Sequence, residues 1–254
     1  MTWIDSHSHH YLSNLSVLSE LKEKGLEGIV SASWIPVRPS GETTIHDLFV
    51  WVVEVEKVRL DRVGIAHYPA IGIHPRCIPP QGLQAALSYV EEFLAQPSVK
   101  ALGEVGLETG DEIEMEVLEP QLRIAKRLDK PAIVHTPRKN KAVVTAKVLK
   151  LLDRVGIDPS LTVVDHITSE IVDDVMRSGR WMGLTIQPAK LTVEEAVKIA
   201  VKYDGSMMMA NTDTSTEPSW PQGVYDLEQS LNDIGAKEVA RMVVYQNARS
   251  FYRL

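Results

Sequence analysis

Short apolar runs rich in Val and Ile recur along this chain, and each is followed by a stretch with apolar residues at helical spacing. Eight such runs can be read, at residues 3–5, 28–31, 68–72, 99–103, 132–135, 161–164, 181–184 and 207–210. Runs of this length that are apolar on both faces are typical of parallel strands covered on both sides. The pattern therefore predicts a buried parallel sheet.

Amphipathic segments fill the gaps and predict helices at 15–24, 45–62, 83–95, 114–128, 141–155, 170–177, 193–203, 225–234 and 237–252. Thr192 and Ser169 stand where N-caps are expected. Strands that alternate with helices form βαβ units, and eight units predict an α/β fold, the closed (β/α)8 TIM-type barrel. A doubly wound open sheet is the alternative. No linker or low-complexity tract divides the chain, so a single domain over 1–254 is expected.

Charge and cysteine usage narrow the partners and the compartment. The net charge of −7 disfavours broad binding to duplex DNA, which usually needs a basic face. A site that takes one nucleic-acid end is compatible with it, because a bound metal supplies local positive charge. Cys77 is the only cysteine, so no intrachain disulfide partner exists. With no signal-peptide pattern and no apolar stretch near the roughly 20 residues of a membrane span, we expect a cytoplasmic protein without a membrane partner.

Imidazole and carboxylate side chains stand at the C-terminal ends of the expected strands. His7 and His9 alternate after the first run and share one face with Asp5, which could orient one of the two rings. Four more such residues each end a different run, namely Glu104, His135, His166 and Asp213. Catalytic groups of barrel enzymes gather at that end of the barrel. The joint pattern predicts a metal site.

Four histidines and two carboxylates are more than one tetrahedral zinc can use, so they favour two divalent metals that share a carboxylate. Glu104 is the candidate bridge, because Gly103 and Gly106 let backbone and metals approach closely. Two metals about 3.5–4 Å apart polarise a phosphoryl or carbonyl oxygen and lower the pKa of a bound water. Asp213 would ligate one metal and accept the proton of the attacking water. Imidazole-rich sites favour Zn, Mn, Fe or Ni, and the carboxylates permit Mg.

These residues resemble the TatD family of metal-dependent hydrolases, within the amidohydrolase-like barrel superfamily. The matching elements follow the family's order over nearly the whole chain: Asp5-Ser6-His7-Ser8-His9, Gly72-Ile73-His74-Pro75, Gly103-Glu104-Val105-Gly106-Leu107-Glu108, His135, His166, Thr212-Asp213 and Gln246-Asn247-Ala248-Arg249-Ser250-Phe251. The resemblance implies that one metal is held by His7, His9, Glu104 and Asp213. It implies that the other is held by Glu104, His135 and His166. It makes His74 a substrate contact or a group behind the ligands, and a turn residue before Pro75 is an equally favoured interpretation.

The chain departs from the family's pattern around these ligands. Asn211 stands where the family's nucleases usually have Glu, and Glu108 stands where they have Asp. Pro137 takes the place of a common Arg, and Arg138 follows it. The sixth strand ends in His166-Ile167-Thr168-Ser169-Glu170 instead of His-Cys-Phe-Ser-Gly. The ligands are intact, but the changed pocket weakens the transfer of a DNase activity.

Arg138 and Lys139 follow His135 on the expected active-site face, where either could receive a phosphate. A solvated helix start is the competing interpretation. Trp34 and Trp220 lie in expected loops, where they could stack on a base or anchor the loop.

The sequence therefore predicts a metal-dependent hydrolase that uses a metal-activated water. The preferred substrate is a phosphodiester, either a small molecule or a nucleic-acid end, as in a deoxyribonuclease. One alternative keeps the same metal centre and moves the chemistry to an amide, a lactone or a phosphotriester, which sequence cannot separate. The other alternative is a non-catalytic barrel that binds metal or ligand.

Overall fold

The predicted strands are all present in the computed structural model, which describes residues 2–216 and 218–254. They are β1 (Trp3–Ser8), β2 (Leu26–Ala32), β3 (Ala66–Ile71), β4 (Ala101–Gly106), β5 (Ala132–His135), β6 (Thr162–Val164), β7 (Trp181–Thr185) and β8 (Met208–Asn211). Every strand pairs in parallel with its neighbour in the chain, so the sheet order is β1 to β8. This sequential order excludes the doubly wound alternative, in which the strand order reverses at a switch point.

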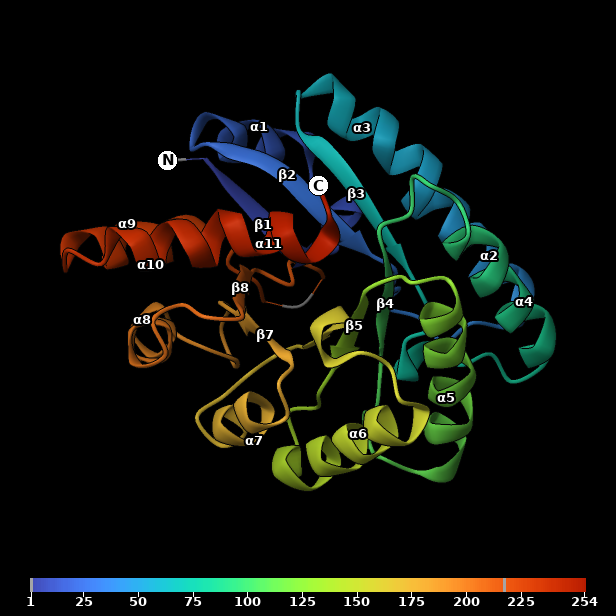
Figure 1. Cartoon of the computed structure of the whole chain (residues 1–254). Helices are drawn as coiled ribbons and strands as arrows, with labels where there is room; N and C mark the ends of the chain where they lie inside the picture. The colour runs from blue at the N-terminus through green and yellow to red at the C-terminus, as the bar shows by residue number, and fades with distance from the viewer. Residues whose placement is uncertain (1, 217) are drawn as a thin grey trace.

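Hydrogen bonds between β1 and the segment after β8 nearly close this sheet into a barrel. The backbone N–H of Asp213 donates to the carbonyl of His7 at 3.0 Å, and that of His9 donates to Thr214 at 2.8 Å. The Asp5 carboxylate adds a bond from the N–H of Thr212 at 3.0 Å. Figure 1 shows β1 and β8 next to each other, with the helices outside the strands. The chain is a single-domain TIM-type barrel, as predicted.

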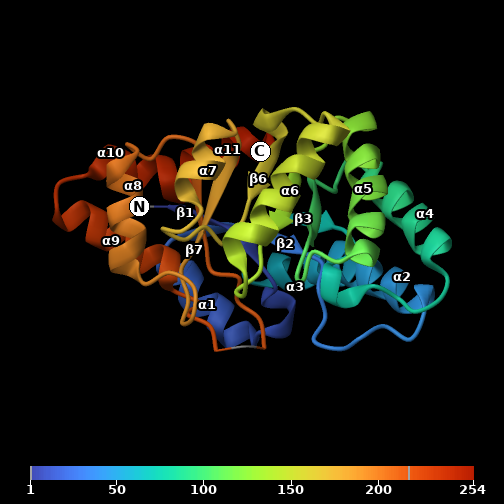
Figure 2. The same ribbon diagram turned by 90° about the horizontal axis from the view of Figure 1, so that it is seen from below.

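The helices alternate with the strands and cover the outside of the barrel. They are α1 (Leu15–Glu23), α2 (Glu42–Val50), α3 (Glu56–Arg62), α4 (Leu83–Leu94), α5 (Glu112–Arg127), α6 (Lys141–Val155), α7 (Val172–Arg177), α8 (Val193–Lys202), α9 (Gly223–Asp233), α10 (Lys237–Arg241) and α11 (Asn247–Tyr252). Two π-helical turns, η2 (Trp51–Val55) and η5 (Met242–Gln246), join α2 to α3 and α10 to α11. The long helices expected at 45–62 and 237–252 are therefore present with a π turn inside each. Figure 2 shows α5 and α6 side by side outside the strands.

Short 3₁₀ turns lie at η1 (His10–Leu12), η3 (Pro75–Cys77) and η4 (Pro159–Leu161). The capping prediction at Thr192 is confirmed, because its hydroxyl and the Glu195 side chain form a reciprocal capping box at the start of α8. The prediction at Ser169 is wrong. Helix α7 begins only after Ile171, which has no side-chain cap, so Ser169 lies too early to cap it.

Apolar side chains that the strands point into the barrel pack against the last helix. Ile4, Ala101 and Ile133 belong to one buried cluster with Phe251 and Tyr252 of α11. A larger apolar cluster joins the strands to the surrounding helices. The two clusters hold the strands rigidly, so that polar side chains at their C-terminal ends are fixed in place. Within the described ranges, no helix is long and apolar enough to cross a bilayer.

Candidate metal centre

The six predicted ligands lie together at the C-terminal ends of the strands. His7 belongs to β1, Glu104 to β4 and His135 to β5. The others follow strands directly: His9 comes after β1, His166 after β6 and Asp213 after β8. All six are buried, and the most accessible, Asp213, is 9% exposed.

Glu104 lies at the middle of the cluster, and its two oxygens face different histidines. Oε1 is 2.9 Å from His135 Nδ1 and 2.9 Å from His166 Nε2. Oε2 is 3.5 Å from His7 Nε2 and 3.6 Å from His9 Nε2. A carboxylate in this orientation offers one oxygen to each of two cation positions.

Asp213 completes the group around Glu104 Oε2. Its Oδ1 lies 3.1 Å from His9 Nε2 and 3.9 Å from His7 Nε2. The ligand atoms of His7, His9, Glu104 and Asp213 all lie within 4.8 Å of one another. An ion bound about 2.1 Å from each donor would leave the donors about 3–4 Å apart. The observed spacing is close to that of a metal site.

Hydrogen bonds behind His7 and His9 fix which ring nitrogen faces the cluster. His7 Nδ1 lies 2.5 Å from Asp165 Oδ2, and His9 Nδ1 lies 2.7 Å from the carbonyl oxygen of Ala32. These oxygens only accept, so Nδ1 carries the hydrogen of each neutral ring and Nε2 is the nitrogen that faces the cluster. His7 Nε2 is buried without a hydrogen-bond partner among the described residues. Burial lowers the pKa of His7 and His9, but the nearby carboxylates outweigh it and raise both pKa values, so the cluster favours a positive charge between these rings and the carboxylates.

His166 follows the same rule. Its Nδ1 lies 2.8 Å from Thr185 Oγ1, whose hydroxyl donates to Asp165 Oδ1 at 3.2 Å. Nε2 is the ring nitrogen that faces Glu104 Oε1, at 2.9 Å. Burial, with the nearby Lys190 ammonium, lowers the pKa of His166 to about 4, so the ring is neutral at pH 7.

His135 reaches the cluster with its other nitrogen. Its Nε2 lies 2.9 Å from Glu108 Oε2, so a hydrogen on Nε2 leaves the lone pair of Nδ1 for the Glu104 side. Burial lowers the pKa of His135, but the carboxylates of Glu104 and Glu108 outweigh it and raise the pKa. Glu108 therefore contacts a proposed ligand. From the sequence, Glu108 was recognised only as a departure from the family's pattern.

The carboxylates are held ionised, as metal ligands must be. Burial raises the pKa of Glu104, but the surrounding histidines outweigh it and hold the pKa well below its usual value. Burial also raises the pKa of Asp213, but Lys190 and His9 outweigh it and hold the pKa well below its usual value. The chemistry of this donor set fits divalent metal ions.

His74 differs from these ligands because the nitrogen that faces the cluster carries the hydrogen of the neutral ring. Its Nδ1 accepts a hydrogen bond from the backbone N–H of Arg76 at 3.0 Å, which caps η3. The hydrogen of the neutral ring is therefore on Nε2, which lies 3.6 Å from Glu104 Oε2. Although the donor atoms of His74, Glu104 and His135 lie within 4.8 Å of one another, an N–H cannot bind a metal. His74 therefore caps the η3 turn through Nδ1, and its Nε2 is buried without a hydrogen-bond partner among the described residues.

The mouth of the centre is lined by Trp34, Arg76, Arg138, Lys190 and Ser215, together with ligands of the cluster. The guanidinium of Arg76 lies 5.3 Å from the centre of the Trp34 ring. Arg138 is exposed and lines this mouth. Its neighbour Lys139 is exposed and is not among the lining residues. Trp220 borders a different cavity.

Two residues of the loop after β7 contact Asp213, and the sequence reading missed both. Gln187 Nε2 donates to Asp213 Oδ2 at 2.7 Å. Lys190 Nζ contacts the same oxygen and lies 2.9 Å from His166 Nδ1 and 3.2 Å from its Nε2. The only signal in the sequence was their position shortly after the seventh strand.

The structure also changes the role given to Asp5. Asp5 does not orient His7 or His9, because its carboxylate accepts from Thr212 and faces His10 Nε2 at 3.3 Å. Asp165, directly before His166, contacts His7 instead.

Gly103 and Gly106 make room for β5. A Cβ on Gly106 would lie 2.5 Å from the carbonyl oxygen of His135, and one on Gly103 would lie 2.8 Å from Ile133 Cβ.

Comparisons with known proteins show the family of this chain. The model of the family described as TatD related DNase matches residues 4–253. A protein of Methanocaldococcus jannaschii, named an uncharacterized metal-dependent hydrolase, is 34% identical over 99% of this chain and 100% of its own length.

Solved structures extend the comparison. The crystal structure of a TatD-like protein from Archaeoglobus fulgidus has a TM-score of 0.86 and 35% identity, covering 99% of this chain and 100% of that one. A TatD homologue from Escherichia coli has a TM-score of 0.73 at 20% identity, covering 99% and 98% of the two chains, and supports the fold alone. Fold, donor set and sequence agree, and the chain belongs to the TatD family of metal-dependent hydrolases.

Proposed function

We propose that this enzyme hydrolyses phosphodiesters, with a nucleic-acid end as its preferred substrate, in the manner of a deoxyribonuclease. The observation that carries the proposal is that Arg76, Arg138 and Lys190 line the same mouth as the anionic cluster. Guanidinium and ammonium groups complement phosphate oxygens. A neutral amide or lactone would not need these cations.

We assign two divalent ions to the cluster, of Zn, Mn, Fe, Ni or Mg. One would be held by His7, His9, Glu104 and Asp213, and the other by Glu104, His135 and His166. Bound there, the ions would polarise a phosphoryl oxygen and lower the pKa of a water. The division of the two Glu104 oxygens between the histidines supports its role as the bridge.

The remaining steps belong to side chains of this chain. Asp213, ionised and next to the mouth, would accept the proton of the attacking water. His74 would donate its Nε2 hydrogen to a phosphoryl oxygen. Arg138 would hold the phosphate, with Lys139 giving a longer-range attraction from the exposed rim. Arg76, held against Trp34, would fix the approach of the substrate.

We further infer that residues 1–254 act as one catalytic domain and that the protein is cytoplasmic. Cys77 is buried and is the only cysteine, which suits a reducing compartment. The negative net charge suits a substrate end that enters one mouth, because an extended duplex would need a basic face.

A substrate panel tests the proposal. Protein loaded with Mn²⁺, Mg²⁺ or Zn²⁺ is incubated with an end-labelled single-stranded oligonucleotide, bis(p-nitrophenyl) phosphate, a phosphotriester, a lactone and an anilide. We expect cleavage of both phosphodiesters, and a loss of at least a hundredfold in Asp213→Asn, which keeps the size of the side chain. Glu194→Gln, an exposed carboxylate on α8, is the matched control and should keep full activity.

If the triester, lactone or anilide is cleaved and both phosphodiesters are left intact, the substrate assignment is overturned, and the protein is still a hydrolase. Metal binding without turnover of any member of the panel would support the non-catalytic barrel.

A further inference from the structure

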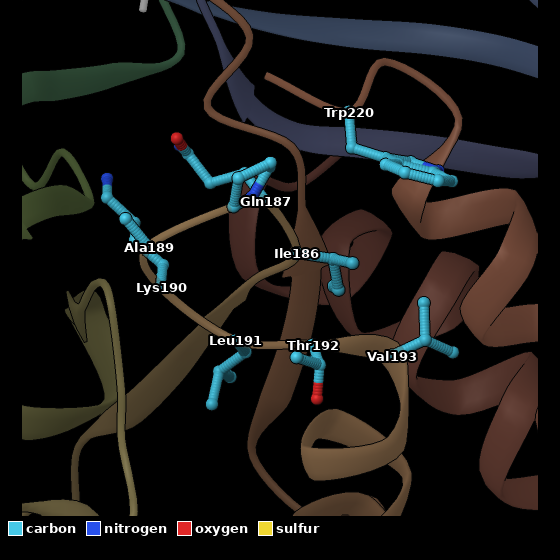
Figure 3. A pocket seen from close by; sticks show the side chains of 9 residues that line it. Ile186, Gln187, Ala189, Lys190, Leu191, Thr192, Val193 and Trp220 are labelled. Atoms are coloured by element: carbon cyan, nitrogen blue, oxygen red, sulfur yellow. The ribbon is translucent and has the colours of Figure 1, made fainter. Parts of the chain in front are cut away.

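A second cavity, of about 290 Å³, lies beside the metal centre in the loop between β7 and α8. Its walls are mostly apolar and include Ile186, Leu191 and Val193, with Trp220 at the rim (Figure 3). Figure 3 also shows the Lys190 side chain extending away from Leu191 and Trp220. This volume is close to the lower end of small-ligand sites, which are about 300–1,000 Å³.

Two residues connect this cavity to the metal centre. Gln187 and Lys190 line it, and both contact the carboxylate of Asp213. Lys190 also lines the mouth over the cluster. A substrate whose phosphate lies at the metal centre therefore has an apolar cavity next to it, on the other side of Lys190.

Trp220 offers a flat apolar face there. Its side chain is 47% exposed, whereas Ile186 and Leu191 are 2% and 3% exposed. The indole Nε1 donates to Asp226 Oδ2 at 2.6 Å, which ties the ring to α9 and sets its orientation. An exposed indole fixed in this way is suited to stacking on another ring.

We propose that this cavity is a subsite for an aromatic ring of the substrate, the base of the nucleotide whose phosphate lies at the metal centre. The inference rests on the proposed phosphodiester substrate. Since most of the wall is apolar, the base is held by stacking on Trp220 and contact with Ile186 and Leu191. Stacking is tolerant of base identity, because every base has a π face. The subsite therefore accepts an unpaired base at a strand end and distinguishes little between bases.

Binding of two product-like probes tests the subsite without requiring turnover. Thymidine 5′-monophosphate and 2-deoxyribose 5-phosphate share the phosphate and sugar and differ in the base. Calorimetric titration of the Mn²⁺-loaded protein should show thymidine 5′-monophosphate binding about tenfold more tightly, since a stacked base contributes about 1–3 kcal/mol. Trp220→Ala should reduce this ratio below about twofold and leave the Kd of the sugar phosphate unchanged.

Trp220→Phe should keep most of the ratio. Val193→Phe, which fills the cavity from its wall, should remove it as Trp220→Ala does. Ile234→Ala, which changes another exposed apolar side chain, outside the cavity, is the control.

Equal Kd values for the two probes, or a tenfold ratio that survives both Trp220→Ala and Val193→Phe, would overturn the subsite. If the ratio is as expected and no phosphodiester is cleaved, the subsite stands and the proposed function fails. If phosphodiesters are cleaved and the base adds nothing, only the subsite fails.

Discussion

Replacement of Lys190 by Met tests whether an ammonium group and a metal ion compete for the place beside Asp213. Lys190 Nζ contacts the Asp213 carboxylate and lies close to both ring nitrogens of His166, and the lysine side chain is 7% exposed. Asp213 and His166 are proposed ligands of the two ions. In the metal-free protein, Lys190 is therefore an internal counter-ion of the site.

The size of the effect follows from this burial. Removing one partner of a buried ion pair destabilises a protein by about 3–5 kcal/mol. Asp213 keeps His9 and Gln187 as partners in the variant. We therefore expect the metal-free protein to lose about 2 kcal/mol. If Lys190 leaves the carboxylate when metal binds, linkage transfers the same free energy to metal binding, which lowers the Kd by about 30-fold.

Two measurements check these values. Mn²⁺ titration against a competing chelator should give the lower Kd in Lys190→Met. Calorimetric scans should show the Tm of the metal-free variant lowered by about 4–8 °C, with the difference from the unaltered protein shrinking at saturating Mn²⁺. Lys202→Met, on the exposed side of α8 where Lys202 pairs with Asp173 at 3.3 Å, is the matched control and should change neither quantity.

An unchanged or higher Kd in Lys190→Met would refute the competition. A fall in Tm that is the same with and without Mn²⁺ would also refute it, because the lysine would then stabilise both forms equally.

Three further predictions concern residues around the site and in the sheet. Asp165→Asn replaces the acceptor behind His7 Nδ1 by a neutral amide, so the Kd for Mn²⁺ should rise about 10- to 100-fold; a Kd within twofold of the unaltered protein would contradict this role. Asn211→Glu restores the residue usual in the family's nucleases, but Asn211 Nδ2 donates to Asp165 Oδ1 at 2.9 Å. The new carboxylate would repel Asp165, so the Tm should fall by several degrees, and an unchanged Tm together with higher nuclease activity would show that the reasoning is wrong. Burial, and then Lys57, lower the pKa of His67 to about 4. The folded state therefore binds fewer protons than the unfolded state between pH 6.5 and 4, and the stability gained from neutral His67 is present above pH 6.5 and lost as the pH falls toward 4. Urea unfolding at pH 7 and 4.5 should show a loss on the order of 2 kcal/mol that shrinks in His67→Gln; equal losses in the two proteins would exclude His67 as the cause.

The barrel could be predicted because its strands are buried on both faces and therefore have an apolar signal. That signal ends where the site begins. Residues 5–8 belong to β1 although they read Asp-Ser-His-Ser, a polar sequence that no apolar pattern marks as a strand. Likewise, the ligands could be predicted since parallel strands bring their C-terminal ends to one rim.

The groups behind the ligands could not be predicted in the same way. Alternation along β1 made Asp5 the expected partner of a histidine, whereas the actual partner, Asp165, comes from the end of β6. That choice depends on the register between distant strands and on the space that Gly183 leaves for the Asp165 carboxylate. Lys190 lies in a loop without periodicity, and only the path of the folded loop brings its ammonium to Asp213.

The seam between β1 and β8 has a consequence for the order in which the enzyme becomes active. His7 and His9 precede Asp213 in the chain and are synthesised before it, because Asp213 follows the last strand of the sheet. The same backbone bonds that join Asp213 to His7 also join the two ends of the sheet. A nascent chain that lacks its last strand also lacks Asp213, so it can neither hold the ion proposed for His7, His9, Glu104 and Asp213 nor accept the proton of the attacking water. The ligands proposed for the other ion, His135, His166 and Glu104, are already made at that stage. Complete metal loading would thus follow the docking of the last strand, and the ion would serve as a marker that the barrel is whole.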